Sequence, residues 1–410
     1  MTITSPAEAD ALIVELVATP EGRADPYSRY AALREHVPVH RSGIGFWVLT
    51  RYDDCQRILR DPRMGKDFSG AALALGLSEE QQAEQAAFRD DHSNMLFADP
   101  PDHTRLRSLA TRAFTPRTIE GLRGSVVALV DELIDGLADG EVDVMDALAF
   151  RLPVTVIGEM LGVPAEDRPQ FRPLVRASTA VLELAVTPEA LAAATAARAT
   201  MEEYFAGLVA ERRARPADDL LTQLIAVEDG GDQLSERELI STAILLFAAG
   251  FETTTHLIGN GLLALLHHPD ELARLRGDRS LLRPGVEELI RFDSPVQITA
   301  RTANEPIEIG SHVIEEGGTV LSILGAANRD PDRFTDPDRL DLGRDEGSSL
   351  SFGSGIHYCL GAALARLEAQ VVFDRLLDRF STMELVGGPP RHRDSLTLRG
   401  LVDLQVRFGA

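Results

Sequence analysis

The sequence has few cysteines: Cys55 and Cys359 are the only two among 410 residues. Two cysteines so far apart do not form a disulfide framework, and they suit a reducing compartment. Positive charge is also scarce, because 41 lysines and arginines stand against 64 aspartates and glutamates, a formal net charge of −23. Nucleic acids and anionic membrane surfaces attract excess lysine and arginine, so neither is expected as a general partner. We therefore predict a cytoplasmic protein.

Long hydrophobic runs are missing as well. The longest apolar stretch, around residues 244–251, is shorter than the roughly 20 residues that a membrane-spanning helix needs. The first 22 residues have no basic segment ahead of an apolar core, so we expect neither a signal peptide nor an anchor. The 44% apolar and 26% charged fractions are those of an ordinary globular protein.

Apolar residues recur at spacings of three and four through most of the chain, which is the pattern of helices with one buried face. Shorter strand-like stretches lie at 45–51, 401–408, and 306–314 paired with 318–323. They do not alternate regularly with helices, which disfavours a parallel doubly wound sheet. No linker or fixed repeat is visible, so we predict a mainly α protein with a small β portion, in which residues 1–410 form a single domain.

A glycine-rich loop surrounds Cys359 and leads into a strongly helical sequence, LSFGSGIHYCLGAALARLE at residues 350–368. The helix dipole and free backbone N–H groups favour a thiolate at the start of a helix. An arbitrary free cysteine is usually a small buried hydrophobe, but the surrounding glycines indicate a backbone that approaches another group closely. A dinucleotide loop would have a third glycine where Tyr358 stands, and a zinc site would need further ligands nearby. The loop alone predicts an activated thiolate that could serve several chemistries.

A second unusual segment lies inside an apolar helix that we predict over 235–267. Residues 248–254, AAGFETT, place an acid and two alcohols after small residues. They can be packing residues, since a threonine hydroxyl can bond the carbonyl one turn earlier. Polar groups in an apolar interior nevertheless need a reason, and the glycine removes side-chain bulk beside them. On this segment alone, packing and function both remain open.

Two further elements carry charges at helical spacing. Glu288 and Arg291 can form an ion pair, although most such pairs are solvated and worth about 0–1 kcal/mol. His103 and Arg107 lie one turn apart after a helix-initiating Asp-Pro-Pro-Asp sequence. They can bind carboxylates or form a basic surface turn. Spacing alone leaves these alternatives open.

Five motifs, spread over nearly the whole chain, make the sequence similar to the cytochrome P450 family. Its cysteine loop, F-x-x-G-x-x-x-C-x-G, is matched by residues 352–361, and its A/G-G-x-D/E-T motif by residues 249–253. The other three are an E-x-x-R pair, an H-x-x-x-R element and a third basic residue, matched by Glu288, Arg291, His103, Arg107 and Arg301. The resemblance implies the mostly α, triangular haem-thiolate fold.

The resemblance also assigns roles to residues. It makes Cys359 the iron ligand of haem b, and it makes Thr253 and Glu252 the residues that relay protons during O–O cleavage. The other implied haem-binding positions are His103, Arg107, Ala249, Gly250, Arg301, Phe352, Gly353, His357 and Gly361. The implied structural residues beneath the haem are Glu288, Arg291 and Arg339. Leu340 stands where the family usually has an aromatic residue. This difference affects packing and leaves the charge unchanged.

The activity implied by the resemblance is that of a monooxygenase, which inserts one atom of O2 into a mainly apolar small molecule by hydroxylation or epoxidation. By analogy the substrate is a natural product such as a polyketide or macrolide. The expected lining residues are Leu245, Ala248, Ala249, Gln297, Thr299 and Leu401. A peroxide-driven peroxygenase would be expected to replace Glu252 and Thr253, and a haem-thiolate sensor would need no Thr253. Both remain alternatives.

The electrons are expected from separate proteins, because no flavin or nicotinamide domain fits in this length. The resemblance implies NAD(P)H, a ferredoxin reductase and a ferredoxin as the source. Arg105, Arg112 and Arg366 are a candidate basic face on the Cys359 side, where an acidic ferredoxin could dock. We expect the protein to be a monomer.

Overall fold

The computed structural model describes residues 3–66, 94–111, 114–137, 140–226 and 233–409, together with residues 78, 80 and 83. The chain divides into two compact units. The first unit comprises Met1–Met64, Leu122–Leu152 and Thr253–Ala410, and the second comprises Gly65–Gly121 and Pro153–Glu252. The single domain that the sequence suggests stays a prediction. Within the described residues, no helix is both long enough and apolar enough to cross a membrane.

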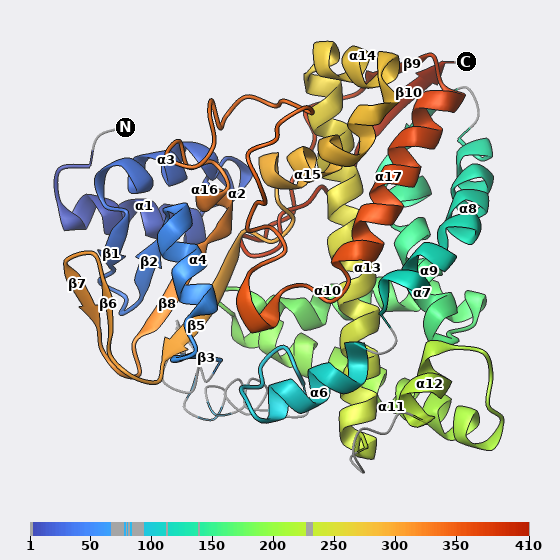
Figure 1. Cartoon of the computed structure of the whole chain (residues 1–410), viewed down its shortest axis with the longest axis horizontal. Coiled ribbons are helices and arrows are strands. Elements are labelled where there is room, and N and C mark those ends of the chain that lie inside the picture. The colour runs from blue at the N-terminus through green and yellow to red at the C-terminus, as the bar shows by residue number, and fades with distance from the viewer. Residues whose placement is uncertain are drawn as a thin grey trace. The chain divides into compact units, whose positions relative to one another are not determined.

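A five-stranded mixed sheet, in the order β1-β2-β8-β5-β3, forms one side of the first unit (Figure 1). Its strands are β1 (Val39–Arg41), β2 (Trp47–Leu49), β8 (Thr319–Ile323), β5 (Ile298–Ala303) and β3 (Met64–Gly65). β2 and β8 are parallel, whereas β1 pairs with β2 and β5 pairs with β8 in the antiparallel sense. A three-stranded sheet has the order β4-β10-β9, with β4 (Gly140–Asp143), β10 (Gln405–Gly409) and β9 (Thr382–Leu385).

The stretch 306–314 differs from its prediction. It forms two short strands, β6 (Ile307–Ile309) and β7 (His312–Ile314), that pair with each other as a hairpin. Gly310 lies at the turn with a φ of 56°, a conformation that glycine adopts without the strain of a side chain. The following strand, β8, therefore pairs with β2 and β5 and not with this stretch.

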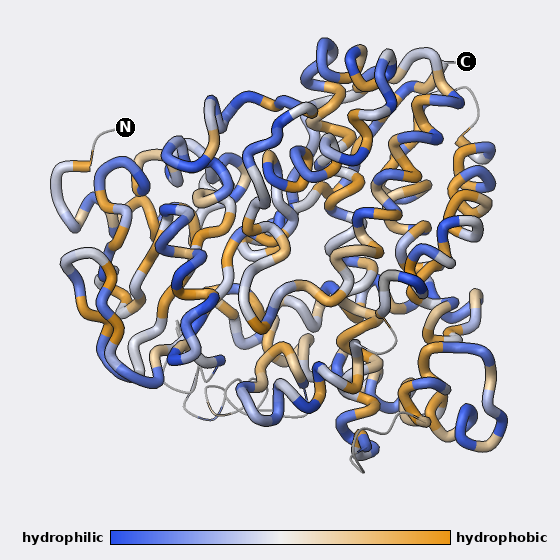
Figure 2. Tube along the Cα trace, in the orientation of Figure 1, coloured by the Kyte–Doolittle hydropathy of each residue, from blue (hydrophilic) through white to orange (hydrophobic). Residues whose placement is uncertain are grey.

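The described part of the first unit also contains nine whole helices, most of which bury one face. They are α1 (Pro6–Ala18), α2 (Pro20–Ala24), α3 (Tyr27–His36), α4 (Tyr52–Arg60), α8 (Arg123–Asp135), α14 (Pro269–Gly277), α15 (Leu282–Phe292), α16 (Leu324–Ala327) and α17 (Ala362–Arg379). Short helical turns are η1 (Met145–Ala149), η4 (Arg279–Leu281) and η5 (Gly355–His357). Figure 2 shows apolar and polar residues mixed along each helix, as expected for helices with one buried face.

α4 illustrates how sequence and packing agree. Its residues at spacings of three and four, which are Tyr52, Cys55, Ile58 and Leu59, are buried in the core beside the five-stranded sheet. Its first turn carries two aspartates and its last turn two arginines, which suits the helix dipole. The prediction that Cys55 is a core residue is confirmed, since it is 0% exposed.

The second unit is helical in its described part. Its elements are α6 (Asp102–Thr111), α7 (Pro116–Gly121), η2 (Ala165–Gln170), α10 (Phe171–Ser178), η3 (Thr179–Leu182), α11 (Pro188–Ala214) and α12 (Leu220–Ala226). An aromatic cluster holds α10, α11 and the first half of α13 (Glu236–His267) together. The ring centroids of Phe171 and Phe247 are 4.7 Å apart, and those of Phe205 and Phe247 are 5.7 Å apart.

Two helices continue from one unit into the other: α9 (Arg151–Leu161) and α13. The prediction of a helix over 235–267 is confirmed, because α13 runs for 32 residues from Glu236 to His267. Within the first unit, the second half of α13 packs closely on α17. A Cβ at Gly261 would lie only 2.8 Å from the ring of Phe373.

Candidate active site

The Cys359 loop joins residue 350 to α17 and packs against the end of α4. The Cys359 N–H donates to the carbonyl of Phe352 at 2.9 Å, and the Gly353 N–H donates to the carbonyl of Leu350 at 2.8 Å. Gly353 and Gly355 both have a φ of 72°. A Cβ at Gly355 would also collide with the carbonyl oxygen of Leu59 at the last turn of α4. The close approach expected of these glycines is therefore, at Gly355, an approach to α4.

The thiol of Cys359 lies just before the N-terminus of α17. The helix begins at Ala362, three residues after Cys359 and two residues later than the sequence suggested, and Gly361 is its N-cap with no side-chain capping bond. The positive end of the helix dipole therefore lies next to the cysteine segment. Cys359 is exposed in the structure, whereas Cys55 is buried. The exposed thiol at a helix start fits the predicted iron ligand.

Three polar side chains that no sequence motif marks fix the first residues of the loop. The Ser351 hydroxyl donates to the Ile290 carbonyl of α15 at 2.9 Å and lies 2.5 Å from the Ser294 hydroxyl. The Asn328 amide donates to both hydroxyls at 2.9 Å, and its carbonyl accepts the Leu350 N–H at 2.7 Å. Serine and asparagine carry no pattern in the sequence, so only the long-range contacts could reveal this cluster.

The α4 side of the loop has one further bond. The Nε of Arg60 donates to the Ser354 hydroxyl at 2.7 Å. The loop is therefore held at its start by α15 and Asn328 and in its middle by α4. Several independent contacts restrict the position of Cys359, as a metal ligand requires.

The E-x-x-R pair is buried and is joined by a second arginine, Arg344, that the sequence did not identify. Glu288 accepts two bonds from Arg291, at 2.6 and 2.8 Å, and their side chains are 1% and 2% exposed. The Nε of Arg344 lies 3.1 and 3.2 Å from the two Glu288 oxygens. This finding corrects the prediction for Arg339, whose side chain is exposed. Arg339 takes part through its carbonyl, which accepts bonds from Arg291 and Arg344.

One face of α13 is less buried than the rest of that helix. Ala249 is exposed and Leu245, Ala248, Gly250 and Thr253 are half-buried, whereas Leu246, Phe247, Phe251 and Glu252 are buried. Within residues 245–253, and apart from Gly250, the less buried positions follow the spacing three, one and four, which places them on one side of the helix. This face fits a flat apolar cofactor or substrate, because three of its four side chains are apolar, two of these are alanines, and only Thr253 is polar. Gly250 itself lies against Ile157 of α9, since a Cβ there would be 2.8 Å from that side chain.

The predicted propionate ligands are distributed over both units. Arg301 on β5 is 4% exposed and donates to the carbonyl of Ala300 at 2.8 Å, and half-buried His357 lies in η5 next to the cysteine. In the second unit, α6 contains both His103, which is 3% exposed, and half-buried Arg107. Within each unit, a histidine and an arginine of this kind are side chains that can bind a carboxylate.

The predicted substrate contacts in the first unit have different surroundings. Thr299 lies beside Arg301 on β5, as the alternation of a strand predicts, with Oγ1 3.4 Å from Nη1. Gln297 is 0% exposed, and its amide donates to the Ser294 carbonyl at 2.7 Å and to the Tyr27 hydroxyl at 3.2 Å. These bonds give Gln297 a structural contact instead of the predicted substrate contact, because the residue precedes the strand. Leu401 is also 0% exposed and lies near Gly259 of α13.

The candidate docking arginines are paired with acids where the structure describes them. Arg105 forms an ion pair with Glu238 in the second unit, and Arg366 forms one with Glu287 in the first. Arg112 lies outside the described residues. The positive charge available to a partner is therefore smaller than the sequence suggested.

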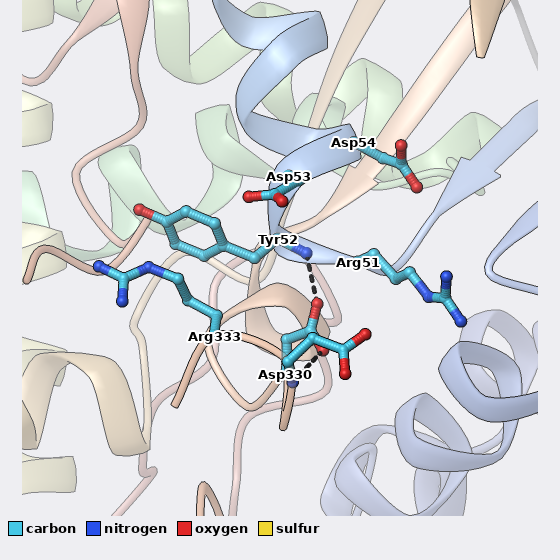
Figure 3. A pocket seen from close by; sticks show the side chains of 7 residues that line it. Arg51, Tyr52, Asp53, Asp54, Asp330 and Arg333 are labelled. Carbon is cyan, nitrogen blue, oxygen red and sulfur yellow. Dashed lines mark hydrogen bonds between the residues drawn. The ribbon is translucent and has the colours of Figure 1, made fainter. Parts of the chain in front are cut away.

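A separate surface pocket of about 260 Å³ lies in the first unit at the start of α4 (Figure 3). It contains none of the predicted site residues, and its lining residues are Arg51, Tyr52, Asp53, Asp54, Asp330, Asp332 and Arg333. The Asp330 carboxylate accepts the Tyr52 N–H at 2.8 Å and the Asp332 N–H at 3.1 Å. The role of Asp330 is therefore to cap backbone N–H groups.

Comparison with known proteins gives one consistent result. Residues 37–405 match the family described as "Cytochrome P450". The chain is 46% identical to Cytochrome P450 107B1 of Saccharopolyspora erythraea, over 94% of this chain and 96% of that protein. It is 40% identical to the polyketide biosynthesis cytochrome P450 PksS of Bacillus subtilis, over 96% and 98%. The crystal structure of P450BioI with an acyl carrier protein carrying hexadec-9Z-enoic acid has a TM-score of 0.87 and 37% identity, over 95% and 100%.

Proposed function

Because this chain belongs to the cytochrome P450 family, we propose that Cys359 is the thiolate ligand of the iron of haem b. Membership makes the protein a monooxygenase with a haem iron that receives electrons from redox partners. The observation that carries the proposal is the exposed thiol at the start of α17, in a loop held by α4, α15 and Asn328. The bound haem would supply an iron that binds O2, and its thiolate ligand favours O–O cleavage.

The cationic side chains would bind the two haem propionates. His357 and Arg301 in the first unit, and His103 and Arg107 in the second, can each donate a charge-assisted hydrogen bond to a carboxylate. The remaining proposed haem contacts need little side-chain bulk or an apolar surface, and they are Ala249, Gly250, Phe352, Gly353 and Gly361. Glu288 and Arg291, with Arg344, would keep in place the segment that precedes the cysteine loop.

Thr253 and Glu252 would deliver protons. The Thr253 hydroxyl is half-buried on the open face of α13, so its Oγ1 can hold a proton next to a ligand there. Glu252 is 2% exposed and is the adjacent acid in the chain, which suits it to replace that proton. Retention of both residues favours a monooxygenase that uses O2 over a peroxide-driven enzyme.

We further propose a mainly apolar natural product, such as a polyketide or macrolide intermediate, as the substrate. The apolar side chains at Leu245, Ala248 and Ala249 support an apolar substrate, and Thr299 would add one hydroxyl to its contacts. The likeness to a polyketide biosynthesis cytochrome P450 supports this class. A screen of natural products for those that shift the haem spin state would identify the substrate, and exclusively polar ligands would contradict the proposal.

NAD(P)H, through a ferredoxin reductase and an acidic ferredoxin that docks on the Cys359 side, is the proposed electron source. Charge reversal at Arg112 and Arg366 should slow reduction and weaken its dependence on salt. Steady NADPH-dependent turnover with a surrogate ferredoxin system would exclude a sensor. A cytoplasmic location and a monomeric state stay predictions.

The ligand assignment is tested by Cys359→Ser, with Cys55→Ala as the matched control. Cys55 is fully buried, and burial raises the pKa of its thiol, so it is not a competing thiolate. The wild type and Cys55→Ala should show the red-shifted band of a ferrous carbonyl complex with a thiolate ligand. Cys359→Ser should lose that band, and a variant that kept it would refute the assignment.

A further inference from the structure

Arg366 makes four contacts near the Cys359 loop. It lies on the second turn of α17, and its Nε and Nη2 bind the two carboxylate oxygens of Glu287, the second at 3.0 Å. Its guanidinium carbon lies 4.3 Å from the centre of the Phe352 ring, and its Nη1 donates to the Tyr358 hydroxyl at 3.3 Å. One side chain therefore contacts both aromatic residues of the loop.

Both aromatic residues are linked directly to Cys359. Tyr358 is its neighbour in the chain, and the carbonyl of Phe352 accepts the Cys359 N–H at 2.9 Å. A planar guanidinium can stack on an aromatic face and bind a carboxylate with two parallel bonds at the same time, which an ammonium group cannot do. Arg366, which follows Cys359 in the chain, therefore fixes the cysteine segment from α17. The contacts from α4 fix the same loop from a helix that precedes it.

Glu287 keeps Arg366 in this position and compensates its charge. Burial of Arg366 disfavours its charge, but its bonds to Glu287 and Tyr358 raise its pKa overall, so the guanidinium stays charged. The side chains of Arg366 and Glu287 are 27% and 41% exposed, so the two charges face each other at a half-buried site. The next residue, Glu288, points to Arg291 and Arg344 instead. Two adjacent carboxylates of α15 thus hold two different segments near the cysteine.

We propose that Arg366 is a positioning residue for the Cys359 thiolate, and that Glu287 sets the net charge beside it and thereby the reduction potential of the iron. This inference rests on the proposed function, because it takes Cys359 as the iron ligand. Reduction adds one negative charge at the iron. A neighbouring positive charge favours the reduced state and a neighbouring negative charge opposes it. Loss of either member of the pair therefore has a predictable sign.

The test is a redox titration of three holoprotein variants. Glu287→Gln leaves Arg366 uncompensated and should raise the potential, whereas Arg366→Gln leaves Glu287 uncompensated and should lower it. Each shift should be at least threefold in the reduction equilibrium, or about 28 mV, since tenfold is 59 mV for a one-electron couple. Arg366→Lys keeps the charge, so its potential should stay near that of the wild type. Its thiolate band should nevertheless weaken, because lysine cannot hold both rings.

A control on the same helix separates a local effect from a general one. Arg375 of α17 binds Asp131 of α8 at 2.5 Å, far along the helix from the cysteine loop. Arg375→Gln should leave the potential unchanged. If the control shifts the potential as much as the test variants, the effect is not local and the inference fails.

Opposite shifts for Glu287→Gln and Arg366→Gln would support the inference, because damage to the loop alone would move both variants in the same direction. Unchanged potentials, or shifts of the same sign, would overturn it, including the case in which only reduction by ferredoxin changes. If Arg366→Gln fails to bind haem, the rise expected for Glu287→Gln still decides. The thiolate band of the wild type tests the proposed function separately, since its absence would refute the ligand assignment itself.

Discussion

Replacing Arg344 by methionine should destabilise the protein far more than the same replacement at Arg339. Arg344 is 8% exposed in its side chain and binds both oxygens of Glu288, which is 1% exposed. It also donates to the carbonyls of Thr335, Asp336 and Arg339. The side chain of Arg339 is exposed, and only its carbonyl contributes to the cluster. The two variants therefore remove very different numbers of side-chain contacts.

The magnitude follows from the buried charge. Breaking a buried pair by removal of one partner costs about 3–5 kcal/mol, and Arg291 still compensates Glu288, so we expect about 3 kcal/mol for Arg344→Met. Arg339→Met should cost less than about 0.5 kcal/mol, as is usual for an exposed side chain. Arg344→Lys should lie between them, because it keeps the charge and loses the forked geometry.

The assay is urea unfolding of the haem-loaded protein followed by far-ultraviolet circular dichroism. For a slope of about 3 kcal/mol per molar, a loss of about 3 kcal/mol lowers the midpoint by about 1 M. The midpoint of Arg339→Met should stay within the error of the wild type. Equal midpoints for the two methionine variants would refute the assignment of Arg344 as the third member of the cluster.

Three further predictions concern pH and backbone geometry. Burial first and Arg399 second lower the pKa of His392 to about 4, and its Nε2 accepts a bond from Arg399 at 3.0 Å. Between pH 7 and 5 the unfolded chain should therefore bind a proton that the folded protein does not, which costs about 2 kcal/mol at about 1.36 kcal/mol per unit. Urea midpoints at both pH values should differ less for His392→Gln, and an unchanged difference would contradict this. Burial raises the pKa of Glu368 well above its usual range, so stability should fall as pH rises through and above the ordinary glutamate pKa. Glu368→Gln should remove this loss. If the free energy of unfolding of the variant still fell with rising pH as steeply as that of the wild type, the result would argue against this prediction. Gly355→Ala should lower haem occupancy and the thermal midpoint, because its φ is 72° and a Cβ would meet Leu59, whereas Gly388→Ala, with open space, should change neither.

Helix and motif positions could be predicted from the sequence because their signals are local. The bounds of α13 follow from apolar spacing over 32 residues, and the start of α17 was only two residues later than expected. The glycines before Cys359 indicated a close approach of the backbone, and Gly355 makes one to α4. The pair Glu288 and Arg291 also forms as its spacing predicts.

The partners of these motifs could not be predicted, because they depend on how distant segments meet. Arg339 and Arg344 are five residues apart in a segment without periodicity, and only the fold shows which side chain turns inward. Gln297 was placed on the face of Arg301 by alternation, but its position before β5 directs its amide to Tyr27 of α3. The sequence also assigned Arg366 to a docking face without its partner Glu287, which is 79 residues away.

Two arginines, Arg344 and Arg366, connect α15 to the segments on either side of the cysteine loop. Glu288 of α15 binds Arg344 of the segment before the cysteine loop, and Glu287 binds Arg366 of the helix after it. The carbonyl of Ile290 accepts a bond from Ser351 at the start of the loop. A single helix thus contacts the chain before, at the start of and after the loop. Together with α4 and Asn328, α15 therefore helps to determine where Cys359 lies, although no residue of α15 would touch the iron.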